Sequence, residues 1–168
     1  DVTNLAMFLY GHPMHAFDLD RVKGGKIVVR RASEGEAFTS LDGVARKLVS
    51  DDLVIADGEV PTALAGVMGG AISEISSATT NVLFECAYFE PRGVRRASRR
   101  HGLHTESSHR FERGVDPSRV PDALAYAVGL TTSWCKESSA AKGSLHVVDG
   151  VARDDAGTRA LAKVTLRA

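Results

Sequence analysis

The residues with the greatest chemical potential lie between His101 and Pro117, in the sequence HGLHTESSHRFERGVDP. The segment combines three histidines with hydroxyl, acidic and basic side chains, so it is too polar to be core. From Arg92 to Arg113 there are seven arginines and two glutamates, a net charge of +5 in a chain whose total is zero. A positive patch on a neutral protein indicates either a docking site for an anionic partner or a solvated helix face.

Two polar side chains elsewhere stand in apolar surroundings. Glu85 lies in the run TNVLFECA (80–87), where an unpaired carboxylate costs free energy to bury. It either pairs with a nearby arginine or serves a ligand. His15 lies in GHPMHAFD (11–18), where it either satisfies a backbone carbonyl in the core or faces a substrate. The glycines of AGVMGG (65–70) mark a bulge or tight strand packing, and both are compatible with a pocket wall.

The elements that must position these residues are mostly short strands. β-rich runs separated by Gly, Asp and Ser lie at 26–31, 36–41, 46–49 and 53–56, and further strands are expected at 80–87 and 144–148. Asp42-Gly43 predicts a hairpin, because Gly adopts the positive φ that a tight turn needs. With helices added, these patterns predict an α+β fold with a mixed, mainly antiparallel sheet and flanking helices.

Two helices are predicted in the second half of the chain. The first begins at Pro91 and ends at Gly102. The second begins at Asp116-Pro117, where Asp is a favourable cap and Pro fits the first turn. Its apolar stripe is predicted to be buried and consists of Val120, Leu124, Ala127, Leu130 and Trp134.

The composition is that of one ordinary globular domain. Of 168 residues, 43% are hydrophobic and 25% are charged, and no apolar run is long enough to span a bilayer. Cys86 and Cys135 both stand in apolar surroundings without metal-ligand spacing, so we expect reduced core residues of a cytoplasmic protein. The abrupt start, without an initiator Met, leads us to expect a fragment of a longer protein.

Three segments together resemble a known family: GHPMHAFDLD (11–20), AGVMGG (65–70) and FECAYFEPRGVRRASRRHGLHTESSHRFERGVDP (84–117). In order and spacing they resemble the B3/B4 editing domain of the bacterial phenylalanyl-tRNA synthetase β subunit. The resemblance implies a B3/B4 domain over residues 1–150, with residues 151–168 as a linker and the start of a following domain. It also implies an enzyme, an ester hydrolase that removes tyrosine wrongly attached to phenylalanine tRNA.

The resemblance implies roles for individual residues. His15 and Asn4 would lie at the scissile ester as the catalytic residues, and Glu85 would accept a hydrogen bond from the tyrosine hydroxyl. At Gly66 and Gly69 the backbone would approach the ligand so closely that any Cβ would intrude on it.

Two hydroxyl side chains complete the implied substrate site. Thr105 and Ser107 would face the ligand, with helix capping as the alternative role. The sequence departs from the family pattern at two positions: Gln is expected where His12 stands, and often Ala at Ser107. The first departure is expected to lie outside the chemistry, and the second alters pocket polarity.

The arginine-rich helix is the predicted nucleic-acid contact, through Arg95, Arg96, Arg99 and Arg100. It would meet the acceptor end of phenylalanine tRNA or, as the alternative, a neighbouring domain of the parent subunit. The other implied partners are the tyrosine moiety and the catalytic α subunit of the parent enzyme. No membrane partner is expected.

The implied chemistry needs no metal and no cofactor for editing, and ATP and magnesium belong only to the parent synthetase. Without a motif for ATP, the chain is not expected to aminoacylate alone. No G-x-S-x-G motif is present, so water is expected to attack the ester directly, with His15 or the terminal ribose hydroxyl as proton acceptor. Two alternatives remain: a metallohydrolase using the pairs His12/His15 and His101/His104, or a non-catalytic tRNA-binding or structural module.

Overall fold

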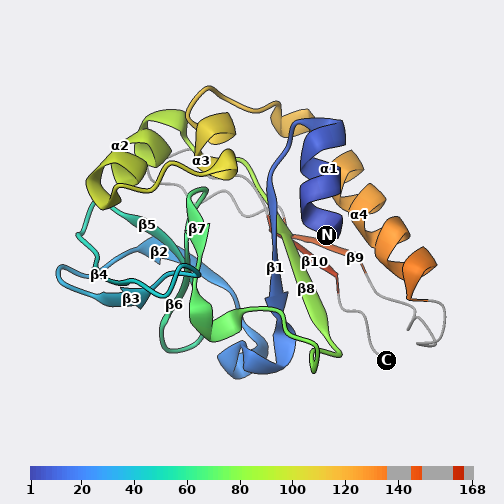
Figure 1. Ribbon diagram of the computed structural model, residues 1–168, viewed down its shortest axis with the longest axis horizontal. Helices are drawn as coiled ribbons and strands as arrows, with labels where there is room; N and C mark the ends of the chain where they lie inside the picture. The colour runs from blue at the N-terminus through green and yellow to red at the C-terminus, as the bar shows by residue number, and fades with distance from the viewer. Residues whose placement is uncertain (136–144, 149–160, 165–168) are drawn as a thin grey trace.

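The computed structural model describes residues 1–135, 145–148 and 161–164 (Figure 1). The helices are α1 (Val2–Tyr10), α2 (Pro91–His101), α3 (Glu106–Phe111) and α4 (Val120–Trp134). The strands are β1 (Met14–Asp18), β2 (Val28–Arg31), β3 (Ala37–Thr39), β4 (Ala45–Lys47), β5 (Leu53–Ala56), β6 (Pro61–Leu64), β7 (Met68–Gly69), β8 (Val82–Cys86), β9 (Leu145–Val148) and β10 (Leu161–Val164). Within the described ranges, no helix is long and apolar enough to cross a membrane.

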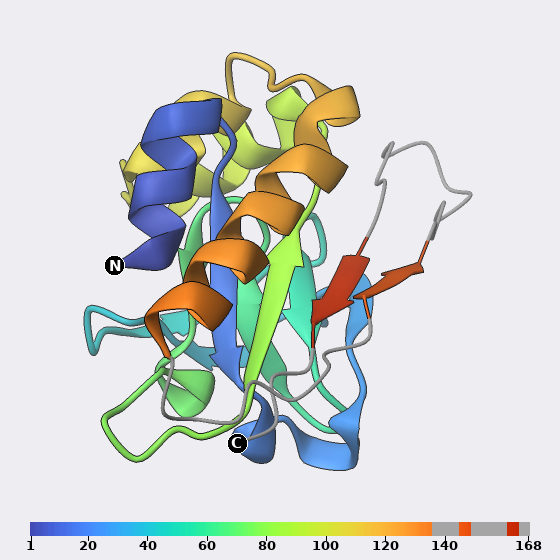
Figure 2. The same cartoon turned by 90° about the vertical axis from the view of Figure 1, so that its right-hand side faces the viewer.

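An antiparallel ribbon of β1 and β8 runs through the middle of the molecule (Figure 1). Successive side chains of a strand point to opposite faces, so Phe84 and Cys86 lie on one side of the ribbon and Leu83 and Glu85 on the other. Phe84 and Cys86 belong to a core cluster with residues of α4, and α1 packs against it. Figure 2 shows α4 crossing in front of the ribbon, with α1 beside the upper part of β1. The other side of the ribbon is left to face the remaining strands.

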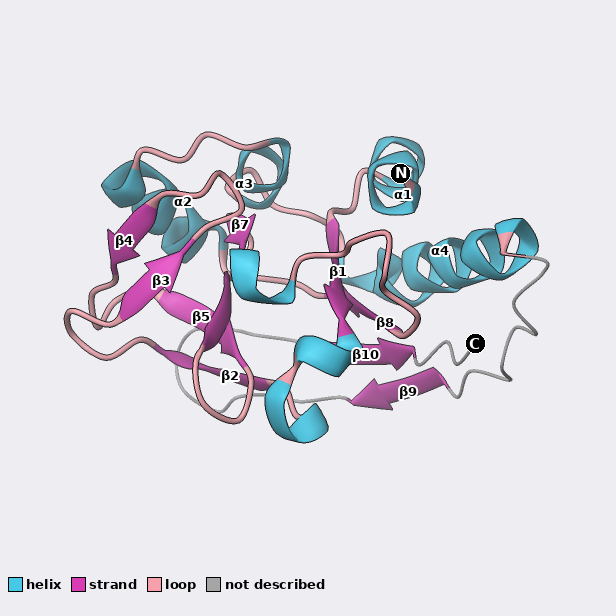
Figure 3. Cartoon of the chain, turned by 60° about the horizontal axis from the view of Figure 1, so that its bottom comes forward, coloured by secondary structure: helices cyan, strands magenta, loops and turns pink. Residues whose placement is uncertain are grey.

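Four of the remaining strands form an antiparallel sheet in the order β2-β5-β6-β7 (Figure 3). The β3–β4 hairpin lies beside it and turns through Gly43 at φ +77°, as Asp42-Gly43 predicted. An isolated bridge between Ser40 and Gly70 joins the hairpin to the segment after β7. All described strand pairs are antiparallel, and with the helices they confirm the α+β fold class.

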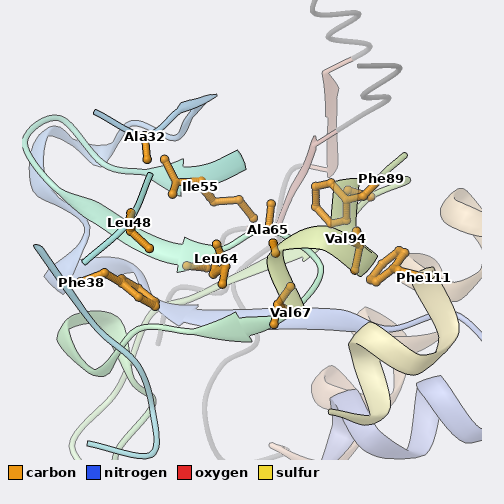
Figure 4. Close-up of a cluster of buried hydrophobic side chains, with 14 of the residues drawn as sticks. Ala32, Phe38, Leu48, Ile55, Leu64, Ala65, Val67, Phe89, Val94 and Phe111 are labelled. Atoms are coloured by element: carbon orange, nitrogen blue, oxygen red, sulfur yellow. The ribbon is translucent and has the colours of Figure 1, made fainter. Parts of the chain in front are cut away.

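The main hydrophobic core joins this sheet to α2 and α3. Figure 4 shows Ile55 and Leu64 from the sheet together with Phe89, Val94 and Phe111 on the helical side, and all five are at most 4% exposed. Burying one large apolar side chain stabilises a fold by about 1.5–3 kcal/mol. This packing therefore holds the two helices firmly against the strands.

The predicted helix limits at Pro91 and Gly102 are confirmed. Pro91 is the first residue of α2, and the side chain of Glu90 accepts hydrogen bonds from the backbone amides of Arg92 and Gly93. Gly102 ends the helix in the left-handed conformation at φ +64°, which Gly adopts without a steric penalty.

The predicted stripe of α4 is right in its first half and wrong in its second. Asp116 caps a short 3₁₀ turn (Pro117–Arg119) that leads into α4. The buried face then runs through Val120, Ala123, Leu124, Ala127 and Thr131. Leu130 is only half-buried and Trp134 is 59% exposed, because the buried face continues four residues after Ala127, at Thr131, rather than three.

The two cysteines differ. Cys86 is buried, as predicted, whereas Cys135 is exposed, so its assignment to the core was wrong. Cys135 follows the last turn of α4. The end of that turn is itself exposed, so apolar residues that precede Cys135 in the sequence do not bury it.

The strand expected at 144–148 is observed as β9, which pairs antiparallel with β10. The predicted domain boundary at Gly150 lies outside the described residues.

Candidate functional site

A cavity of about 250 Å³ lies between the free side of the β1–β8 ribbon, the strands β5–β7 and the first turns of α1 and α3. Apolar side chains, including Met7, Ile55 and Phe89, supply much of its wall. The structure brings together all seven residues expected around the ester and the amino acid: Asn4, His15, Gly66, Gly69, Glu85, Thr105 and Ser107. The cavity is small for a drug-sized ligand, and its dimensions suit a single amino-acid side chain.

Glu85 and His15 are directly opposite each other in the β1–β8 register. Facing residues of an antiparallel pair have Cβ atoms about 4.5–5.5 Å apart, so both side chains share one patch of the cavity wall. The alternation along β8 explains why a carboxylate occurs in an apolar run. Its neighbours Phe84 and Cys86 face the helices, while Glu85 faces the cavity.

The carboxyl group of Glu85 is buried, at 5% exposure, and makes no hydrogen bond or ion pair to a described residue. The expected alternative, an ion pair with a nearby arginine, is not observed among those residues. Burial raises the pKa of Glu85 to about 8, because the charged form loses its hydration. The carboxyl is therefore largely protonated at neutral pH, and its oxygens have hydrogen-bonding capacity to offer a ligand.

The imidazole of His15 is also held without a polar partner. Its Nε2 is buried and unpaired, and its ring meets Phe17 edge to face at 4.5 Å between centroids. The alternative role, bonding to a core carbonyl, is not observed among the described residues. Burial lowers the pKa of His15 to about 4, so the ring is neutral at pH 7 and is a weak base.

At Gly69 and Gly66 the absent side chain makes room for neighbouring side chains, and the close approach of a ligand to the backbone there stays a prediction. A Cβ on Gly69 would lie 2.6 Å from Nε2 of His15, so the absent side chain makes room for the imidazole. A Cβ on Gly66 would meet side-chain atoms of Phe89 and Val94 at 3.0 Å, and both residues belong to the main core, although Phe89 also lines the cavity. Gly66 also has φ +70°, a conformation that L side chains rarely adopt.

Replacing Gly69 with alanine should push the His15 ring out of its buried position. The new methyl group would overlap the imidazole edge, and rotation into the open cavity is the available response. The ring would regain hydration, so the pKa of His15 should rise from about 4 toward its ordinary value of 6.5. Histidine titration by NMR measures this, with Gly129→Ala as control, because a Cβ there meets nothing within 4 Å. An unchanged His15 pKa in Gly69→Ala would contradict the geometry.

Thr105 and Ser107 fix the turn that carries Gly66. Thr105 is the N-cap of α3, since its Oγ1 accepts from the backbone amide of Ser108 at 2.9 Å. The same hydroxyl donates to the carbonyl of Val67 at 2.8 Å, and the Ser107 hydroxyl donates to the carbonyl of Gly66 at 3.1 Å. Helix capping, the alternative considered for Thr105, is thus observed. Both hydroxyl protons are committed to the cavity wall.

Asn4 lies at the mouth of the cavity on the first turn of α1. Its Nδ2 donates to the carboxylate of Asp1 at 3.0 Å, and Asp1 also caps the helix. This bond orients the side-chain amide and leaves its oxygen available to a ligand.

The four arginines predicted to contact nucleic acid line no part of the cavity. Arg96 and Arg100 form ion pairs with Asp51, and Arg100 also pairs with the fully buried Asp52. Half of the predicted set therefore joins α2 to the loop before β5.

The other two arginines of that set, Arg95 and Arg99, are exposed. Neither makes a hydrogen bond or ion pair to a described residue. The charge available to an anionic partner on this helix is consequently smaller than the sequence count indicates.

The histidine pairs proposed as metal ligands are not arranged to share an ion. His12 is buried, with Nε2 2.9 Å from the carbonyl oxygen of Ala87, and burial lowers its pKa. His101 bonds through Nε2 to Asp52 at 2.7 Å. In the part of the chain that the structure describes, no group of three or more His, Cys, Asp or Glu side chains could hold a metal ion.

The apolar walls were missed by sequence reasoning. Phe89 continues the two-residue alternation that begins at Glu85, and this signal would have placed it on the cavity side. Phe111 and Met7 lie on helices distant in sequence, and no local pattern points to them.

Comparison with known proteins gives a consistent family match. Residues 1–136 match the B3/4 domain family. The chain is 59% identical over 130 residues to the phenylalanine–tRNA ligase beta subunit of Geobacter metallireducens and 60% identical to that of Anaeromyxobacter dehalogenans, covering 77% of this chain in both cases. Identity to the beta subunit of Yersinia pestis is 50% over 135 residues, or 80% of this chain. The chain spans 16–17% of the length of these relatives.

Proposed function

Because the chain belongs to the B3/4 domain family and matches phenylalanine–tRNA ligase beta subunits, we propose that it is an editing domain that hydrolyses tyrosine esterified to phenylalanine tRNA. One observation carries the proposal. Glu85 presents to a cavity of amino-acid size a carboxyl group that makes no hydrogen bond or ion pair to a described residue, and a ligand in the cavity could satisfy it.

The need for such a site follows from the chemistry of selection. A hydrophobic pocket for phenylalanine discriminates poorly against tyrosine, which adds only a hydroxyl group. A second pocket that hydrogen-bonds the phenol achieves the opposite selection, because phenylalanine would leave its buried polar group unpaired. The carboxyl of Glu85 in an apolar wall is suited to this role.

The reaction is attack by water on the ester carbonyl, with release of tyrosine and of the ribose hydroxyl of the tRNA. His15 and Asn4 both line the cavity and would orient the water and the ester. With its pKa lowered to about 4, His15 is suited to hydrogen bonding rather than to holding the proton. The free hydroxyl of the terminal ribose, supplied by the substrate, would hydrogen-bond the attacking water and relay its proton to the leaving ribose oxygen.

The remaining parts of the proposal concern the longer protein to which the domain would belong. We place the domain in a cytoplasmic phenylalanine–tRNA ligase, in which a catalytic α subunit and ATP with magnesium carry out aminoacylation. The acceptor end of the tRNA would then reach this cavity, while the domain itself needs no cofactor. Of the four arginines predicted to contact the RNA, Arg95 and Arg99 remain available to it.

The test is deacylation of tyrosyl and phenylalanyl esters of the same tRNA by the full-length protein, without ATP. We expect faster hydrolysis of the tyrosyl ester, unaffected by a zinc-selective chelator. Loss of activity with the chelator and its return with zinc would favour a metallohydrolase. Binding of the tRNA without hydrolysis of either ester would favour the non-catalytic module.

A further inference from the structure

An aromatic side chain stands exposed beside the mouth of the cavity. Phe8 of α1 is 66% exposed. It lies four residues after Asn4, which lines the cavity, so the two side chains are neighbours on one face of the helix. The step between them is one helical turn, about 5.4 Å along the axis.

The ring of Phe8 is held by an arginine from a different helix. The guanidinium carbon of Arg110 lies 5.5 Å from the ring centroid. Arg110 is fixed in turn by Glu106, because Nη1 donates to its carboxylate at 2.6 Å and to its backbone carbonyl at 2.9 Å. Glu106 itself lines the cavity, one helical turn before Arg110.

The helices α1 and α3 therefore contribute residues in the same pattern. Each provides a polar residue to the cavity, Asn4 from α1 and Glu106 from α3, and each provides a residue one turn further on. Those second residues, Phe8 and Arg110, meet each other. Even with the guanidinium over its ring, Phe8 keeps 66% of its surface exposed to solvent, on the helix face that it shares with Asn4.

We propose that Phe8, braced by Arg110, is the stacking platform for the terminal base of the aminoacyl-RNA. The inference rests on the proposed function, which places the amino acid in the cavity and its ester at the mouth near Asn4. The ribose then separates the ester from the base by a span comparable to one helical turn, which brings the base to Phe8. A base stacked on an aromatic ring is bound through its π face, and a nearby arginine adds attraction for the RNA.

The experiment measures binding, so that it is independent of hydrolysis. The first probe is tyrosine joined by an amide to the 3′ position of 3′-amino-3′-deoxyadenosine, and the second is tyrosinamide, which has no nucleoside. With the full-length protein, Phe8→Ala should raise the dissociation constant of the first probe about fivefold to a hundredfold, the range expected for one stacked base. The same substitution should leave that of tyrosinamide unchanged.

Leu9→Ala is the matched control, because Leu9 is the next residue of α1 and is 60% exposed. It should affect neither probe, and Phe8→Trp should retain binding of the nucleoside probe. Equal weakening of both probes by Phe8→Ala would overturn the platform, since the effect would then come from the cavity. Unchanged binding of both probes, or no binding by the wild type, would also overturn it. Normal binding without hydrolysis of either tRNA ester would instead contradict the proposed function alone.

Discussion

Replacing Glu85 with alanine should reduce the preference for the tyrosyl over the phenylalanyl ester about ten- to a hundredfold. The buried carboxyl has no partner among the described residues, so a phenol that enters the cavity is the group available to it. Beside phenylalanine the neutral carboxyl would be buried without a partner, which costs about 1–3 kcal/mol, and this converts to roughly that ratio of rates. The measurement is a pair of deacylation rates on the two esters of one tRNA, in the full-length protein.

His15→Ala is the matched comparison for this prediction. It should slow both esters by a common factor, because His15 would act at the ester that the two substrates share. Glu85→Gln keeps an acceptor oxygen and should retain part of the preference for tyrosine. If Glu85→Ala still favoured the tyrosyl ester to the original degree, Glu85 would have no part in recognition.

Glu85→Gln should also raise the free energy of unfolding at pH 7 by about 3 kcal/mol. Burial raises the pKa of Glu85 from its ordinary 4.5 to about 8, so the folded protein keeps a proton that the unfolded chain releases. Wild-type stability therefore falls as the pH rises from 4.5 to 8. At about 1.36 kcal/mol per pH unit, the loss has reached roughly 3 kcal/mol by pH 7. Glutamine has a similar shape and no charge. The free energy of unfolding of Glu85→Gln, measured with denaturant from pH 4 to 8, should therefore lack the fall that Glu85 causes in the wild type.

Glu36→Gln is a control for which the expected change in the free energy of unfolding at pH 7 has the opposite sign. The hydrogen bond from Arg30 holds the pKa of Glu36 below its ordinary value, so this carboxylate stabilises the fold above that value and the contribution is lost on acidification. Glu36→Gln should accordingly be less stable than wild type at pH 7. Because the pKa of His15 is lowered, stability also falls as the pH falls from 6.5 to 4. This loss is common to wild type and variants, so it cancels when their stabilities are subtracted. Equal stability of Glu85→Gln and wild type at pH 8 would contradict the burial of an unpaired carboxyl.

Local backbone chemistry was the part of the fold most readily predicted from the sequence. Asp42-Gly43 specifies a turn, and Pro91 and Gly102 specify the two ends of a helix, because each residue restricts or permits particular dihedral angles on its own. Trp134 illustrates where this reasoning ends. A helical stripe indicates which residues share a face, but how far the facing strands extend along it depends on distant parts of the chain.

The gathering of the expected residues around one cavity could likewise be predicted, through resemblance, whereas several of their structural contacts could not. Gly69 makes room for His15, and Gly66 for the side chains of the core, which only the three-dimensional packing reveals. Arg100 reads as surface charge in the sequence, yet it pairs with Asp52, a residue 48 positions earlier. Ion pairs across such separations leave no periodic signal.

The antiparallel pairing of β1 with β8 also determines when the site arises during folding. His15 and Glu85 face each other only after the segment between Asp18 and Val82 has been closed into a loop, which has an entropic cost that the local β3–β4 hairpin largely avoids. The hairpin can therefore form early, whereas the juxtaposition of the two buried titratable groups waits for a long-range contact. We therefore expect desolvation of the imidazole and of the carboxyl to occur late in folding, and a peptide from one side of that loop holds only one of the two residues.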